Sequence, residues 1–134
     1  MNNEILKNII DTHLGGTSES QVDAYGMLNV NIGGDQLLSI VGELKTNHGF
    51  IYLTDICASH YPERSNAEFD VVYHLHNLVK NMRVRLKVSL PKSNLDIPTL
   101  TDLFVGANWM ERETFDFYGI QFVGHPDLRR ILNM

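Results

Sequence analysis

The chain has 134 residues, of which 43% are hydrophobic and 20% charged, and its formal net charge at pH 7 is -5. This length suits one domain, and the acidic balance argues against a nucleic-acid binder, which needs a surplus of Lys and Arg. A single cysteine excludes an internal disulfide and a self-contained iron–sulfur cluster, which takes about four thiolates. No apolar run reaches the ~20 residues that cross a bilayer, and the first residues lack the basic segment of a signal peptide. We therefore expect an intracellular, water-soluble protein.

The first part of the chain is predicted to form a helix and a hairpin. Isoleucine and leucine recur at i,i+4 spacing after Asn2 and Asn3, either of which can cap a helix that ends at Gly15-Gly16. Apolar residues then alternate with asparagine over 28–32, which is the period of a half-buried strand. Residues 22–24 are expected to form the partner strand across the intervening Tyr-Gly turn.

The middle of the chain is predicted to form a second helix and three strands. Asp35 occupies the N-cap position of a helix whose apolar residues repeat at helical spacing until 47–49. A strand over 50–58 follows. Two further strands, over 69–75 and 82–90, alternate apolar and polar residues, and the link between them is short enough for an antiparallel hairpin.

The last third of the chain loses this periodicity. Two prolines over 91–106 disfavour helix and strand, so we expect an extended connector there. A short helix is predicted to begin after Asn108, which resembles a capping box with Glu111, and Gly119 occupies the C-terminal cap position.

This order of elements predicts the α+β class, with a two-layer α/β sandwich in which a mostly antiparallel or mixed sheet carries its helices on one face. The predicted order is α-β-β-α-β-β-β, followed by the connector and the short C-terminal helix. We expect a single domain over 1–134, with an α+β core over 1–90 and the connector, helix and tail over 91–134.

His74 and His76 are the first candidates for chemistry. They lie two residues apart on a predicted strand, so their side chains share one face and could begin a zinc site. Two histidines do not complete a shell of three or four ligands, and the adjoining strand offers Arg83, Arg85 and Lys87, whose charge opposes a cation. The favoured interpretation is a solvent-facing polar stripe that could meet an acidic partner, with no metal ligand in this chain.

Cys57 and His60 are the second candidates, as a nucleophile and its base. An odd separation along a strand points two side chains to opposite faces, so a buried structural thiol is the favoured role for Cys57. The sequence contains no Rossmann fingerprint, no P-loop, no GxSxG and no HExxH. We expect no catalytic and no cofactor-binding residue.

The most unusual segment is 107–132, which mixes five aromatic residues with seven charged ones. An exposed helical pair such as Arg112 and Asp116 is worth only ~0.3–0.5 kcal/mol, which does not account for this concentration of charge. Two interpretations stay open. The segment is either a capped helix with core aromatics that covers one end of the sheet, or a protein–protein anchor, because Trp, Tyr and Arg dominate interface energetics.

Segment 111–132, with its ERE, GHP and LRR motifs in register, resembles the signature of the C subunit of NADH-quinone oxidoreductase, respiratory complex I. Residues 72–75 and the stretch from 97 to 109 resemble the same family more loosely. The resemblance implies a hydrophilic subunit of the peripheral arm, docked against the quinone-site subunit on the cytoplasmic side of the inner membrane. Members carry no flavin, no iron–sulfur cluster and no catalytic residue; the complex oxidises NADH, reduces quinone and translocates protons.

By this resemblance, the conserved end would dock on the other peripheral-arm subunits. The residues expected to make its polar contacts are Glu111, Arg112, Glu113, Asp116, His125, Arg129 and Arg130. Family members usually continue with a proline-rich and basic tail where this chain ends at Met134, and many have an acid in the turn that reads Ser59-His60-Tyr61-Pro62 here. Wrapping of the partner by such a tail and a role for that acid are therefore not carried over from the resemblance.

Two alternatives remain. The same scaffold role could belong to a related membrane-bound hydrogenase or formate-oxidising complex. In a different class, the chain could be a free-standing metalloenzyme built around His74 and His76.

Overall fold

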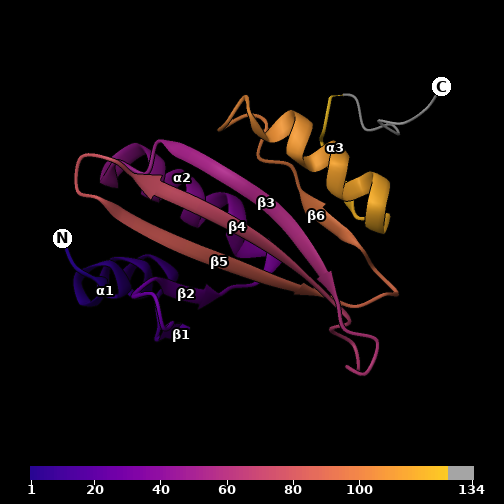
Figure 1. Ribbon diagram of the computed structural model, residues 1–134, viewed down its shortest axis with the longest axis horizontal. Helices are drawn as coiled ribbons and strands as arrows, with labels where there is room; N and C mark the ends of the chain where they lie inside the picture. The colour runs from indigo at the N-terminus through magenta and orange to yellow at the C-terminus, as the bar shows by residue number, and fades with distance from the viewer. Residues whose placement is uncertain (127–134) are drawn as a thin grey trace.

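The computed structural model describes residues 1–126, which form a five-stranded sheet with helices packed against it (Figure 1). The helices are α1 (Asn3–Leu14), α2 (Leu37–His48) and α3 (Ala107–Tyr118), and a 3-10 turn, η1 (Gly34–Gln36), precedes α2. The strands are β1 (Glu19–Val22), β2 (Leu28–Asn31), β3 (Tyr52–His60), β4 (Phe69–Asn77), β5 (Met82–Leu90), β6 (Asp96–Pro98) and β7 (Gln121–Val123). The predicted α+β class and the predicted order of the main elements are confirmed.

The large sheet has the strand order β1-β2-β5-β4-β3 and is mixed. The β1–β2 and β4–β5 pairs are the two predicted antiparallel hairpins, although β1 lies at Glu19–Val22 rather than at the predicted 22–24, and β3 pairs antiparallel with β4. The N-terminal hairpin joins the rest through a parallel pairing of β2 with β5. Strand β4 therefore lies inside the sheet, whereas β3 forms one edge, and this difference decides the exposure of the polar residues described below.

The prediction that 91–106 is an extended connector without strand or helix is wrong in one respect. Residues 96–98 form β6, which pairs in parallel with β7 beyond the last helix. Backbone bonds from Gln121 to Leu95 (2.8 Å) and from Thr99 to Val123 (2.9 Å) extend this pairing. Three residues are too few to show a strand period, and a proline is tolerated at the end of such an edge strand, so local pattern could not reveal it.

Two predicted helix caps are also wrong. Asp35 lies within η1, which runs directly into α2, so the chain is already wound when the helix begins and Asp35 does not cap it. Helix α3 begins at Ala107, so Asn108 lies inside its first turn, and Glu111 turns into the protein interior. Two other predicted caps are confirmed. The Asn2 side chain caps the N-terminus of α1, and Gly119 closes the C-terminus of α3 with a positive φ of 72°.

A single hydrophobic core joins the helices to one face of the sheet. It includes Leu6 and Ile10 of α1, Ile40 and Leu44 of α2, and Tyr73 of β4. The segment after β5 also contributes buried apolar side chains to this core: Ile97, Leu100, Phe104, Ala107, Ile120 and Phe122. Helix α3, which runs beside edge strand β3 (Figure 1), is thus anchored through the core. Within residues 1–126, each helix is too short or too polar to span a lipid bilayer.

Candidate functional site

Helix α3 presents two contrasting faces. Its inner face buries Ala107, Glu111 and Thr114. Its outer face leaves two large aromatic side chains in water, with Trp109 52% exposed and Phe117 78% exposed. Each exposed aromatic forgoes the free energy of apolar burial, roughly 25 cal/mol for each Å² left in water.

Glu111 holds α3 to the preceding segment. Its carboxylate accepts a hydrogen bond from the Thr99 hydroxyl (2.5 Å) and another from the backbone N–H of Leu100 (2.7 Å). Burial raises the pKa of Glu111, and the two hydrogen bonds oppose that rise. The buried hydroxyl of Tyr73, whose pKa is raised by its own burial and then by the Glu111 charge, has no hydrogen-bond partner among residues 1–126.

The other docking residues proposed on α3 lie around its outer side. The Arg112 guanidinium sits over the Trp109 ring, 5.5 Å from the ring centroid, in cation–π geometry. Glu113 is exposed, and Asp116 is partly exposed. Glu111 is completely buried, so it contributes to this surface from inside the protein rather than by direct contact.

The chain after α3 returns to the start of that helix. The Nε2 atom of His125 lies 3.1 Å from the carbonyl oxygen of Asn108, so the motif histidine ties the chain after β7 to the first turn of α3. Arg129 and Arg130 lie outside the described residues.

The prediction of a solvent-facing stripe at His74 and His76 is wrong for His76, which is only 8% exposed. Strand β4 lies inside the sheet, and Tyr52 and Arg83 flank His76 from the two neighbouring strands. His74 is partly buried and accepts a hydrogen bond at Nε2 from Nε of Arg85 (2.9 Å). Partial burial and then the Arg85 charge lower the pKa of His74.

The prediction of a buried thiol at Cys57 is also wrong, because β3 is an edge strand and Cys57 is exposed. Its sulfur lies in a cluster with Asp55 and His74, whose ligand atoms are all within 4.8 Å of one another. Partial shielding from water, followed by the Asp55 charge, raises the pKa of the Cys57 thiol. His76 is not part of this cluster, so the structure does not assemble the two-histidine site of the metalloenzyme hypothesis.

Sequence reasoning missed this cluster because it depends on strand register. Asp55 lies directly opposite His74, and Cys57 lies opposite Val72, further along the same pair of strands. The i,i+2 spacing of Asp55 and Cys57 places both on one face of a strand, and that was the available signal.

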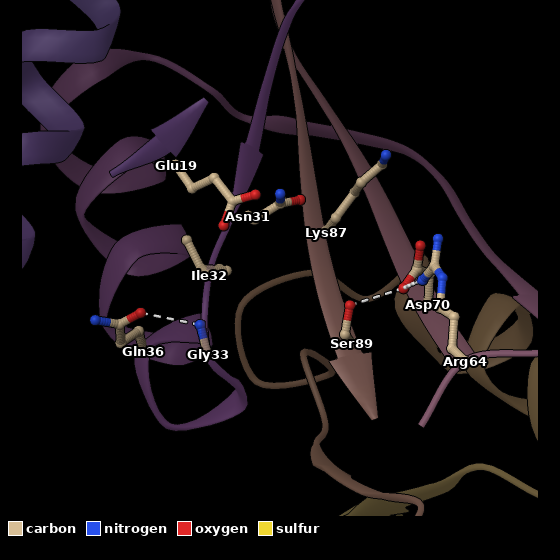
Figure 2. Close-up of a pocket in the computed structure, with 9 residues that line it drawn as sticks. All are labelled: Glu19, Asn31, Ile32, Gly33, Gln36, Arg64, Asp70, Lys87 and Ser89. Atoms are coloured by element: carbon tan, nitrogen blue, oxygen red, sulfur yellow. Dashed lines mark hydrogen bonds and ion pairs between the residues drawn. The ribbon is translucent and has the colours of Figure 1, made fainter. Parts of the chain in front are cut away.

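A polar pocket of about 500 Å³ lies on the helix-free side of the sheet (Figure 2). Its most buried charge is Asp70, which accepts hydrogen bonds from Arg64 Nη1 and Ser89 Oγ, both at 2.8 Å. Lys87 and Glu19 add one charge of each sign to the wall. The Asp70 carboxylate is thus held by an ion pair with Arg64 and a hydrogen bond from Ser89.

Comparison with known proteins identifies the family. The model of the 30-kDa subunit of respiratory-chain NADH dehydrogenase matches residues 30–134. The chain belongs to this family. It is 46% identical over 110 residues to the C subunit of NADH-quinone oxidoreductase from Ruegeria pomeroyi, an alignment that covers 81% of this chain and 54% of the relative. The corresponding subunit of Rhizobium rhizogenes is 39% identical over 132 residues, covering 97% of this chain and 64% of that protein. The chain therefore spans between half and two thirds of the length of these relatives.

Solved structures support the same family. A trypsin-resistant fragment of Nqo5 superposes with a TM-score of 0.82 and 30% identity, covering 92% of this chain and 98% of the fragment. A chain from the membrane-bound sulfane sulfur reductase, described as an archaeal respiratory membrane complex, superposes with a TM-score of 0.81 and 25% identity. That match covers 97% of this chain and 75% of the other.

Proposed function

We propose that the chain is a non-catalytic, structural subunit in the peripheral arm of a proton-translocating NADH:quinone oxidoreductase. It supports electron transfer from NADH to quinone indirectly, by docking the quinone-site subunit on the cytoplasmic side of the inner membrane. The family membership supports this role, and so does the single cysteine, which leaves no thiolate set for an iron–sulfur cluster of its own. Catalysis belongs to the assembled complex, and this chain holds no flavin and no electron-carrying cofactor.

The observation that carries the proposal is the outer face of α3. Trp109 and Phe117 are exposed on α3, and Arg112 lies over the Trp109 ring; aromatic and guanidinium groups of this kind are typical of interface hot spots. Glu111 and His125 hold this face in place from within the chain. The proposed contacts to the partner are made by Arg112, Glu113, Asp116, His125, Arg129 and Arg130.

The test is assembly in native membranes. Arg112→Glu should leave the isolated chain folded yet block its incorporation into the complex, because reversing the charge puts like charges together at the interface. Arg129→Glu should do the same. Lys80→Glu, at the exposed β4–β5 turn, is the matched control and should assemble normally. Normal incorporation of both Arg112→Glu and Arg129→Glu would contradict the proposal.

A second candidate keeps the scaffold role and changes the complex. The match to a chain of the membrane-bound sulfane sulfur reductase favours it, because that protein is a different respiratory membrane complex with the same fold in one of its chains. A membrane-bound hydrogenase or a formate-oxidising complex would be the corresponding assembly. Mass spectrometry of proteins that co-purify with the chain distinguishes these, since only the leading candidate predicts a flavin-containing, NADH-oxidising partner.

A further inference from the structure

The cluster on strands β3 and β4 has the composition of a metal site. A thiol, an imidazole and a carboxylate are the three ligand types that zinc accepts in proteins, and soft thiolate with imidazole favours zinc over magnesium or calcium. Cys57, His74 and Asp55 supply one of each, and their ligand atoms lie within 4.8 Å of one another.

The sheet positions these ligands without help from loops. Asp55 and Cys57 share one face of β3 because they are two residues apart, and Asp55 is the direct cross-strand partner of His74. Tetrahedral ligands at about 2.0–2.3 Å from zinc lie roughly 3.5 Å from each other. Separations of at most 4.8 Å therefore lie within about an ångström of that value.

From this geometry we propose that Asp55, Cys57 and His74 bind one zinc ion, with water completing the shell. This proposal departs from the sequence-based expectation of no metal ligand in this chain. Asp55 and Cys57 also line an open pocket of about 320 Å³ beside α3, which gives an ion a path from solvent. The ion has no part in electron transfer, because zinc does not change oxidation state.

One nitrogen of His74 is available to the ion. Nε2 accepts the hydrogen bond from Arg85, whereas Nδ1 is buried and has no partner within the described part of the chain. When Nδ1 binds zinc, the ring proton moves to Nε2 and Cys57 releases its thiol proton to solvent. Nε2 then no longer accepts from Arg85, so that guanidinium must turn away.

Arg85 has other polar partners nearby. Its Nη1 atom already donates to Oδ1 of Asn29 (3.1 Å) and lies 3.8 Å from Oδ2 of Asp23. The positive charge of Arg85 therefore competes with the cation, and its removal should strengthen binding. This expectation separates the proposed site from nonspecific binding at surface carboxylates, which would not respond to Arg85.

The experiment titrates the purified chain with Zn²⁺ against a chromophoric chelator, and with Co²⁺ as a spectroscopic probe of thiolate ligation. Wild type should bind one ion, and Cys57→Ser and His74→Gln should each weaken binding roughly tenfold or more. Cys57→Ser should also remove the sulfur-to-cobalt charge-transfer band. Arg85→Gln should bind zinc several-fold more tightly than wild type.

Controls make the outcome decisive. His60→Gln changes an exposed histidine on β3, the strand that carries Asp55 and Cys57, and should leave the zinc affinity unchanged. His48→Gln tests a second cluster, in which His48 Nε2 lies 3.0 Å from Glu43 on α2. Unchanged affinity in Cys57→Ser, or loss of binding in His48→Gln instead, would overturn the proposal. Thermal unfolding of each variant verifies that it is folded.

Discussion

The carboxylate of Glu111 accepts a hydrogen bond from the backbone N–H of Leu100 at 2.7 Å, across eleven residues of chain. This contact joins the first half of α3 to the residues that follow β6. The acidic residue that opens the family motif is therefore a structural contact between α3 and the segment after β6.

Glu111→Ala should lower the free energy of unfolding by roughly 2–4 kcal/mol. The substitution leaves the buried N–H of Leu100 without its acceptor, removes one of two acceptors near the Thr99 hydroxyl, and leaves a cavity. Urea denaturation of the isolated chain measures the loss. Glu113→Ala, on the exposed side of the same helix, should change stability by less than about 0.5 kcal/mol. Equal effects of the two substitutions would contradict this role for Glu111.

Glu111 should also make stability depend on pH in an uncommon direction. Because burial raises its pKa above the ordinary value of 4.5, the folded state binds this proton more tightly than the unfolded chain does. The carboxyl therefore lowers stability as the pH rises from 4.5 through its folded pKa. Glu111→Gln removes this dependence, so the stability of the variant relative to wild type should increase between pH 4.5 and pH 7. A difference in stability between Glu111→Gln and wild type that stays constant with pH would contradict this prediction.

Asp11 should show the opposite behaviour. Hydrogen bonds from Lys7 (2.6 Å) and from Ser18 (2.7 Å) lower the pKa of Asp11 from 3.8 to about 2. This stabilisation is complete above pH 4 and is lost as the pH falls toward 2. Asp11→Asn should cost roughly 1 kcal/mol at pH 7 and much less at pH 2. Asp35→Asn, at an exposed carboxyl that caps no helix, is the matched control and should show little change at either pH.

Gly49 should tolerate alanine less well than Gly15 does, although both close helices with nearly equal positive φ angles of 79° and 77°. A Cβ atom at Gly49 would lie 2.9 Å from Nδ2 of Asn77, whereas a Cβ at Gly15 meets no atom within 4 Å. Asn77 is itself bound to the carbonyl of His48 at 2.8 Å. Gly15→Ala should therefore cost about 1 kcal/mol for the left-handed backbone alone, and Gly49→Ala clearly more. Equal melting temperatures for the two variants would count against this difference.

Repeating local patterns were enough to predict the main elements, and a motif resemblance indicated the family. The alternation over 82–90 identifies β5 because every second side chain of a half-buried strand faces the core, and the glycines after α1, α2 and α3 mark helix ends through their left-handed backbone. The run from Glu111 to Leu132 is long and specific enough to carry the family resemblance.

Contacts between distant segments were decided only by the folded chain. The burial of His76 and the exposure of Cys57 follow from the positions of β4 inside the sheet and β3 at its edge, and strand order is not written in any one strand. The partners of Glu111 and the meeting of Asp55 with His74 depend on how segments pack and on cross-strand register. Periodicity specifies which face of an element is apolar, but it does not specify which residues of another element that face will meet.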